Sequence, residues 1–242
     1  MKLQSKLHSM LLIACLFFTT LSFAVEPLPD NLLAFDSKQS TQLLKQSANT
    51  NTLKVLEHFA TQQTVTYCGP ASAITVLNAM DIVAPIDYVP APIAPGYFEF
   101  AYFSQNNFFS EAVHEIIHPD RVFENGMTLK QLAAAIETWG VSAKPHFANK
   151  LTLEQFRTMI KRALANDKYV IANFLRSAMQ QQGGGHHSPV AAYDETTDRF
   201  LVLDVARYKY QSYWVKAKDL WKASVDLDET HSRGFIIISE LP

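Results

Sequence analysis

The chain has 242 residues, 48% of them hydrophobic and 18% charged, a composition typical of globular proteins. Its formal net charge is −2, so bulk electrostatics gives no reason to expect a nucleic acid or an anionic membrane as partner. The length suits one full domain, since domains run to about 100–200 residues.

The first two dozen residues have the pattern of a secretory signal. A basic stretch precedes the apolar run 10–18, and segment 22–24 offers the small residues where a signal peptidase cuts. The run is shorter than the roughly 20 residues of a spanning helix, so we expect no stable membrane insertion. We expect residues 1–24 to be cleaved and residues 25–242 to form a periplasmic or secreted domain. A lipid anchor at Cys15 is the alternative, but the apolar run continues past it.

The N-terminal half of the mature chain is predicted to be helical. Apolar residues recur among polar ones over 38–60, and a polar stretch at 47–52 divides this segment into two short helices. A third helix is expected over 69–80, where apolar residues follow helical spacing. Residues 81–108 are rich in prolines and aromatic side chains, and we expect a long ordered loop that wraps the body.

Two further helices are marked by capping boxes, Thr128 with Gln131 and Thr152 with Gln155. The later part of the chain changes to short β-branched and aromatic runs. The predicted strands are residues 169–175, 188–193, 200–205 and 234–239, with a hairpin loop at 194–199. Helices first and strands later predict an α+β fold.

Cys68 is the one thiol that remains after export, in the sequence Tyr67-Cys68-Gly69-Pro70. Proline is favoured at the first helical positions, so Cys68 stands at or just before a helix start. Backbone N–H groups at that end stabilise an anion and lower the pKa of a thiol, and the thiolate is the nucleophile. An inert core cysteine is the alternative.

Two histidines are candidates for the base that such a nucleophile needs. Residues 183–185 are all glycine and lead directly into His186 and His187 at the entrance of a predicted strand. The glycines let a substrate backbone come close, although a mobile surface turn with incidental histidines is the alternative. Successive residues of a strand face opposite sides, so we expect only one of the two to serve.

Asp204 follows four apolar residues at the end of a predicted strand, so we expect it to be partly buried and paired. It could orient the histidine, form a turn or pair with Arg207. The chain order Cys, His, Asp matches cysteine peptidases, in which the acid fixes the imidazole tautomer. Gln62, six residues before Cys68, could donate its amide to an oxyanion, with Gln63 as its competitor.

A second motif suggests different chemistry. His114, Glu115 and His118 spell the H-E-x-x-H pattern of zinc metalloproteases, with both histidines on one helix face and the glutamate as general base. Pro119 ends the segment at once and no third ligand follows at the usual spacing. We therefore expect no metal site in the chain.

The chain resembles the phytochelatin synthase family, whose catalytic domain is a relative of papain-like cysteine peptidases. The segments that carry the resemblance are Gln62 to Gly69, the helix Ala71 to Met80, Asn106 to Ser110, Gly126 to Leu129, Gly185 to Pro189, Asp204 to Tyr210, Leu220-Trp221 and Ser232 to Phe235. The resemblance implies a helical N-terminal lobe with the cysteine and an antiparallel β-sheet C-terminal lobe with the histidine and aspartate.

The family's Gly-His-x-Ser-Pro pattern implies His186 as the base, and it puts His187 where the family usually has an apolar residue. It likewise implies Asp204 as the orienter and Gln62 as the oxyanion donor. Arginine holds a carboxylate through two parallel hydrogen bonds, which suits the γ-glutamyl end of a substrate. The substrate contacts that the resemblance suggests are Asn173, Arg176, Gly185, Arg207 and Arg233.

The implied activity is a glutathione γ-glutamylcysteinyltransferase or deglycylase that works through a Cys68 acyl-enzyme and requires no cofactor. Cd²⁺ or other heavy-metal ions would be activators or thiolate complexes of glutathione, and a homodimer is expected. Single-domain prokaryotic members, the type expected here, cleave glycine more readily than they build polymers. Gln211-Ser212 replaces the family's Pro-Pro.

The rival of another class is a periplasmic thiol or metal binder without turnover. Its nitrogen ligands would be His114, His118, His146, His186 and His187.

Overall fold

The computed structural model describes residues 25–90 and 97–241. The predicted signal peptide and the Cys15 anchor lie outside these residues and stay predictions. Within the described ranges, no helix combines the length and the apolar character that crossing a bilayer demands.

The helices confirm most of the predicted pattern. The predicted helices are α1 (Lys38–Ser47), α2 (Thr50–Glu57), α3 (Cys68–Ala79), α6 (Leu129–Glu137) and α7 (Leu153–Ala165). Both expected capping boxes form, because each threonine hydroxyl accepts from the glutamine N–H while the glutamine side chain accepts from the threonine N–H. Elements that the sequence does not predict are α4 (Glu111–His114), α5 (Pro119–Asn125), α8 (Ala217–Ser224) and the 3₁₀ turns η1 (Ala148–Lys150) and η2 (Arg176–Met179).

One seven-stranded sheet forms the centre of the molecule, and all its neighbouring strands are antiparallel. In sheet order the strands are β1 (Leu33–Ala34), β8 (Tyr213–Lys216), β7 (Arg199–Val202), β6 (Gly185–Asp194), β5 (Tyr169–Leu175), β11 (Gly234–Glu240) and β4 (Val141–Phe147). The four predicted strands are β5, β6, β7 and β11, and the α+β class is confirmed. The sequence of β4 hides a strand because lysine, proline and histidine interrupt it.

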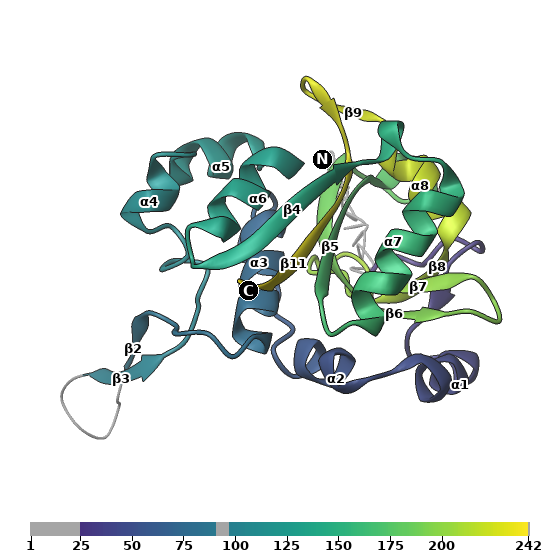
Figure 1. Ribbon diagram of the computed structural model, residues 1–242, viewed down its shortest axis with the longest axis horizontal. Helices are drawn as coiled ribbons and strands as arrows, with labels where there is room; N and C mark the ends of the chain where they lie inside the picture. Colours follow the sequence, from purple (N-terminus) through teal and green to yellow (C-terminus); the bar gives the residue numbers. More distant parts are fainter. Residues whose placement is uncertain (1–24, 91–96, 242) are drawn as a thin grey trace, which may run out of the picture.

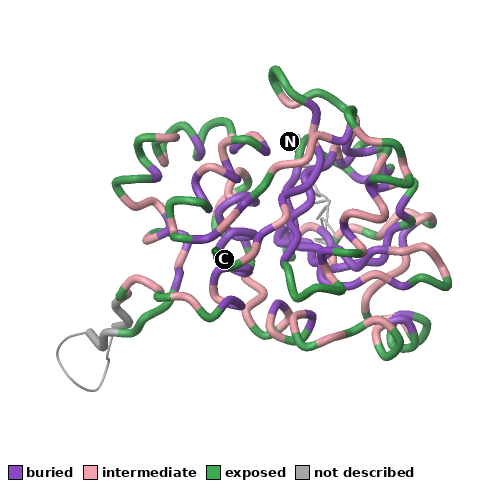
Figure 2. Tube along the Cα trace, viewed as in Figure 1, coloured by how far each residue is buried: buried purple, intermediate pink, exposed green. Residues whose placement is uncertain are grey.

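Helices cover both faces of this sheet (Figure 1). α3 and α6 pack on one face and share an apolar cluster with Ile236, whereas α7 and α8 pack on the other with Phe235. Consecutive residues of β11 thus enter opposite clusters, as the period of two requires. Figure 2 shows the central strands buried between the helices. The two apolar clusters fix the sheet that carries the candidate histidines.

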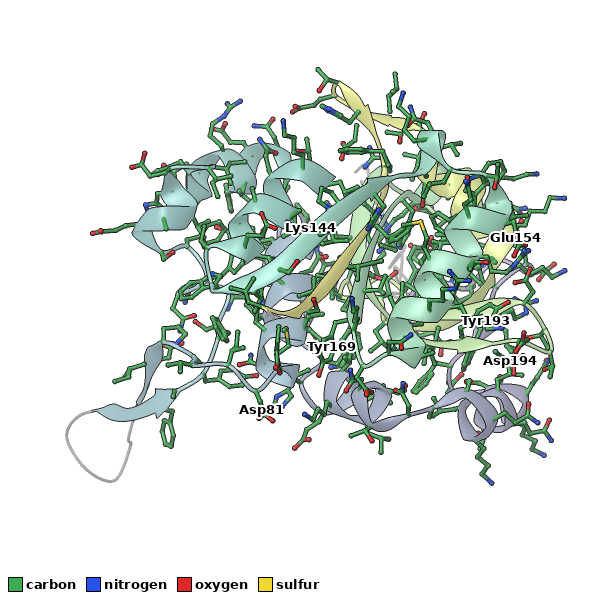
Figure 3. All side chains as sticks on the ribbon, in the orientation of Figure 1. Asp81, Lys144, Glu154, Tyr169, Tyr193 and Asp194 are labelled. Carbon is green, nitrogen blue, oxygen red and sulfur yellow. The ribbon has the colours of Figure 1, made fainter. Side chains whose placement is uncertain are left out.

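The predicted hairpin loop 194–199 is confirmed and aligns β6 with β7. Asp194 pairs with Arg199 in the register, and its carboxylate accepts hydrogen bonds from Thr196 and Thr197. Figure 3 labels Asp194 beside Tyr193 at this turn. Because the strands are antiparallel, the start of β6 and the residues after β7 lie at the same end of the sheet.

The expectation that residues 81–108 wrap the body as a loop is wrong. β2 (Ile86–Pro90) and β3 (Tyr97–Ala101) pair antiparallel and stand away from the rest of the molecule (Figure 1). The prolines suggested a loop, yet Pro90 occupies the last position of β2, where a missing N–H is tolerated. Phe103 and Phe108 follow and are fully buried, so only the later part of the segment joins the core.

Two more strands complete the fold. β9 (Leu227–Asp228) and β10 (His231–Ser232) form a short antiparallel hairpin, with Glu229 in its turn at a φ of 60°. The hairpin leads directly into β11.

Candidate active site

Cys68 is the first residue of α3, as the sequence predicts. The residue is 7% exposed, and its side chain packs with Ala71 and Val205. Tyr67, the N-cap residue, makes no side-chain hydrogen bond to the first turn, so that turn keeps N–H groups that favour a nearby negative charge. The thiol is therefore buried at the positive end of a helix.

Two imidazoles act on this thiol. Nδ1 of His187 lies 3.8 Å from Sγ of Cys68. Burial by itself would raise the pKa of Cys68, but hydrogen bonds from His186 and His187 and the charges of both rings hold the pKa well below its ordinary value. His186 makes the larger of the two contributions. The expectation that only one of the two histidines serves as the base stays a prediction, although both rings lower the pKa of the thiol.

Asp204 holds His186. Nε2 of His186 lies 2.9 Å from Oδ1 of Asp204, and a carboxylate only accepts, so Nε2 carries a proton and Nδ1 is left for the thiol. Burial would lower the pKa of His186, but the charge of Asp204 and the hydrogen bonds to Asp204 and Cys68 raise it. A raised pKa beside a lowered one favours a thiolate–imidazolium pair.

The apolar run before Asp204 predicted that this residue would end the strand, but β7 ends at Val202 and Asp204 lies two residues beyond it. Arg176 donates to both of its oxygens at 2.8 Å, and the N–H of Ala206 donates at 3.0 Å. Burial would raise the pKa of Asp204, but His186 and Arg176 hold it well below its usual range. We call His186, Asp204 and Arg176 the inner side of the site.

Arg176 does not face a substrate in this arrangement. Its side chain is buried, with the guanidinium committed to Asp204 and to Oε1 of Gln181. The structure therefore favours a positioning role for Arg176 over the suggested γ-glutamyl contact.

A second network meets the thiol through His187. Nδ2 of Asn173 lies 2.6 Å from Nε2 of His187, and Oδ1 of Asn173 accepts from Arg233 at 3.0 Å. Arg233 also pairs with Asp228 at 3.2 Å. We call His187, Asn173, Arg233 and Asp228 the outer side of the site.

The outer side borders a pocket of about 170 Å³. Cys68, Gly185, His187, Asp228 and Arg233 are among the residues that line it. A Cβ at Gly185 would overlap the Arg233 guanidinium, whereas one at Gly184 would meet no atom of the described residues within 4 Å. Only Gly185 is therefore a steric requirement for the position of Arg233.

Gln62 is buried near Cys68, and its amide is already occupied. Nε2 donates to the Thr64 carbonyl at 2.7 Å and to the Tyr208 hydroxyl at 2.8 Å. Its Oε1 has no hydrogen-bond partner within the described ranges. An oxyanion role therefore requires one of these two hydrogen bonds to break. Gln63, the competitor, is exposed.

Arg207 lies outside the pocket. Its guanidinium lies over the Phe59 ring at 5.1 Å, and it is not among the residues that line the pocket. Within the described residues it forms no ion pair with Asp204.

The sequence did not single out Asp228 or Tyr208. Asp228 stands in an acidic run five residues before Arg233, and nothing in that run marks it out until the β9–β10 hairpin turns it toward Arg233. Burial and the charge of Cys68 both raise the pKa of Tyr208, although the Gln62 hydrogen bond opposes them, so this phenol lies within electrostatic reach of the thiol.

The H-E-x-x-H pattern does not lie on one helix. α4 ends at His114, Glu115 follows it, and His118 is the N-cap of α5. Pro119 starts α5, which explains the break. Across residues 25–90 and 97–241, no three His, Cys, Asp or Glu side chains gather where they could hold a metal ion. The structure thus gives no support to the zinc metalloprotease or to a metal binder that uses His146, which stacks on Phe235.

A thiol at a helix start, a histidine on a strand and an aspartate after the next strand have the arrangement that cysteine peptidases use. The family model described as phytochelatin synthase matches residues 23–235, and the chain belongs to this family.

Three relatives illustrate the match. A glutathione gamma-glutamylcysteinyltransferase 1 from Lotus japonicus is 29% identical over 213 residues, which is 85% of this chain and 40% of the relative. Its namesake from Arabidopsis thaliana is 30% identical over 190 residues, covering 77% and 36%. The glutathione gamma-glutamylcysteinyltransferase of Schizosaccharomyces pombe is 23% identical over 227 residues, covering 91% and 52%. The chain thus spans about half or less of the length of these curated relatives.

Proposed function

We propose that the chain is a glutathione γ-glutamylcysteinyltransferase with papain-like lobes, in which the N-terminal helices carry Cys68 and the sheet carries His186 and Asp204. The observation that carries the proposal is the buried Cys68 thiol with its lowered pKa beside His186, whose other nitrogen is held by Asp204. The printed names of the relatives supply the substrate.

In the first half-reaction, the Cys68 thiolate attacks the carbonyl carbon of the cysteine–glycine bond of glutathione. The new C–S bond leaves the carbonyl oxygen negative, and the Cys68 N–H with an amide N–H of Gln62 stabilises it. His186 gives its Nδ1 proton to the glycine nitrogen as the C–N bond breaks. Free glycine and a γ-glutamylcysteinyl thioester result.

In the second half-reaction, His186 takes a proton from the attacking group and the thiolate leaves. If water attacks, the product is γ-glutamylcysteine. If the α-amino group of a second glutathione attacks, the product is a short phytochelatin.

The outer side has the charges that a γ-glutamyl group requires. The α-amino acid end of that group carries a carboxylate and an ammonium. Arg233 supplies donors for the carboxylate, and Asp228 beside it supplies acceptors for the ammonium. Arg233, Asp228 and Cys68 all line the same pocket.

The test is to incubate the chain with glutathione, measure free glycine and identify the other products by mass spectrometry. We expect glycine release by the native protein and none by Cys68→Ser. No glycine release by the native protein, with or without Cd²⁺, would refute the proposal. The ratio of γ-glutamylcysteine to longer peptides separates hydrolysis from transfer.

Four accompanying proposals concern location, metal ions, assembly and reductant. The protein acts in the periplasm or outside the cell, which fractionation tests. Heavy-metal ions act through glutathione thiolates and not through a resident site, so a metal-free S-alkyl glutathione should also be cleaved. The protein forms a homodimer, which light scattering tests.

The low-pKa thiol, with no second cysteine after export, should make activity depend on reductant.

A further inference from the structure

Tyr208 contacts the proposed oxyanion donor, but the proposed reaction gives it no role. Its hydroxyl oxygen lies 2.8 Å from Nε2 of Gln62. Gln62 is buried, whereas Tyr208 is 48% exposed. The contact joins a buried amide to a side chain that reaches the solvent.

The direction of this hydrogen bond can be assigned. Nε2 of Gln62 also lies 2.7 Å from the Thr64 carbonyl oxygen, which only accepts, so the amide nitrogen belongs on that side. An amide nitrogen only donates, so the Tyr208 oxygen is the acceptor in its contact. The phenolic proton is not used in this bond, and it has no acceptor among the residues that the structure describes. Tyr208 therefore keeps a proton that it can donate.

Two backbone contacts put this pair of side chains beside the thiol. The Thr64 carbonyl that binds the amide also accepts from the N–H of Tyr67, the residue before Cys68. The backbone N–H of Gln62 donates at 2.9 Å to the carbonyl of Val205, whose side chain packs on Cys68. The amide, and the phenol bonded to it, therefore lie near the first N–H of α3.

The phenol is a neutral donor at the pH at which the enzyme works. Burial raises the pKa of Tyr208, the Gln62 hydrogen bond opposes this, and the charge of Cys68 raises the pKa further. The ordinary tyrosine pKa is about 10, so the hydroxyl keeps its proton near neutral pH. When the thiolate attacks, its negative charge passes to the carbonyl oxygen of the substrate, where this proton can stabilise it.

We infer that Tyr208 is a second side-chain donor to the oxyanion. In the tetrahedral intermediate, the hydrogen bond between Gln62 and Tyr208 is exchanged for two hydrogen bonds to the carbonyl oxygen, one from each side chain. Because the two donor atoms are 2.8 Å apart, a single oxygen can lie within hydrogen-bond distance of both. The N–H of Cys68 is the third donor.

This exchange stabilises the transition state more than the bound substrate. Charge-assisted hydrogen bonds are stronger than neutral ones, so the contact between Gln62 and Tyr208 is worth breaking for an oxyanion and not for a neutral carbonyl. The phenol keeps its proton throughout, and His186 remains the group that transfers one. The inference deepens the proposed function and rests on it, since it takes Cys68 as the nucleophile.

The test measures glycine release from glutathione and, in parallel, acylation of Cys68 by p-nitrophenyl acetate, followed as a burst of p-nitrophenol. Tyr208→Phe should lower the kcat of glycine release by about 10²–10³-fold with little change in KM. It should slow acylation by the ester by about tenfold or more. Tyr193→Phe is the control and should change neither rate, since it also loses a hydroxyl hydrogen bond, to Asp198 at 2.9 Å, at the far end of β6.

A double variant separates donation from mere orientation of the amide. Two donors to one oxygen predict that Tyr208→Phe still slows ester acylation when it is added to Gln62→Ala. If Tyr208 only orients the amide, it adds nothing once that amide is gone, and this result would overturn the inference.

Two further outcomes would also overturn it. An unchanged or faster rate in Tyr208→Phe would show that the phenol only occupies the Gln62 amide. Iodoacetamide alkylates a thiolate without forming an oxyanion, so its rate on the Cys68 peptide should be the same in the native protein and in Tyr208→Phe. An equal loss in alkylation and acylation would assign the effect to the nucleophile instead. Circular dichroism checks that each variant folds. The ester assay needs no glutathione, so failure of the proposed function shows separately as absent glycine release by the native protein.

Discussion

The inner and outer sides of the site differ in how far their charged side chains are buried. On the inner side, Asp204 is fully buried and its carboxylate is bound by His186, Arg176 and the Ala206 N–H. On the outer side, Arg233 and Asp228 keep 11% and 18% of their side-chain surface exposed. The inner charges have no free face for a ligand, whereas the outer charges border the pocket.

This difference separates positioning from recognition. Rigid, desolvated partners hold a catalytic histidine in one tautomer. Partly exposed charges can instead give up their contact with each other and bind a charged substrate. Changes on the inner side should therefore reduce turnover or stability, and changes on the outer side should reduce affinity for the substrate.

The largest effect should come from removing the thiol that both sides share. Cys68→Ser should lower glycine release by about 10⁴-fold or more while the fold is kept, because the nucleophile is lost. Glu115→Ala is the control, since a metalloprotease would lose its general base there and this site should lose nothing. Activity that survives Cys68→Ser and disappears in Glu115→Ala would reverse the assignment.

The next effect concerns the buried ion pair of the inner side. Arg176→Met should lower the free energy of unfolding by about 3–5 kcal/mol, because the buried Asp204 keeps His186 but loses the guanidinium that binds both of its oxygens.

Arg157 offers a matched control, since it binds Asp198 through the same two-point geometry at 2.8 Å on a more exposed surface. Arg157→Met should cost only about 0–1 kcal/mol in a urea titration. Equal losses in the two variants would show that burial does not distinguish these pairs.

A smaller effect should come from the outer side. Gly185→Ala must displace the Arg233 guanidinium, and the loss of a charge-assisted hydrogen bond should lower kcat/KM for glutathione by about 10–100-fold, mainly through KM. Gly184→Ala, in the same loop with open space around it, should stay near the native value. A fall in kcat alone would place Gly185 on the catalytic and not the recognition side.

The smallest effect is a dependence on pH near neutrality. Activity needs the Cys68 thiolate, whose pKa is lowered, so the acid limb should lie below the ordinary thiol value of about 8.5. It also needs the His186 imidazolium, whose pKa is raised, so the basic limb should lie above about 6.5.

Between these limbs kcat/KM should be flat, and outside each it should fall by about tenfold per pH unit. A rate that climbs steadily to pH values of about 8.5 would indicate an ordinary thiol.

Much of the fold was predictable because local chemistry marks it. The capping threonines of α6 and α7 and the apolar runs of β5, β6 and β7 lie in contiguous sequence. The β2–β3 hairpin was not, because its prolines favour a loop and only the pairing of the two strands overrides them.

The features of the site also differ in whether the local sequence predicts them. The Cys68 helix start is local, and the apolar run before Asp204 correctly indicates burial. The partner of Arg176 lies 28 residues away, and only the register of β5, β6 and β7 brings the two together. The same register determines that His187 faces Asn173, so the role of the second histidine could not be read from the sequence.

The edge strand β4 has a consequence for self-association. β4 ends the sheet, and an unpaired edge invites another strand to add to it. Lys144, labelled on β4 in Figure 3, keeps a charge there in a pair with Glu137, and Pro145 has no N–H to offer an added strand. This edge is therefore protected against aggregation, and a second copy of the chain should dock on another face.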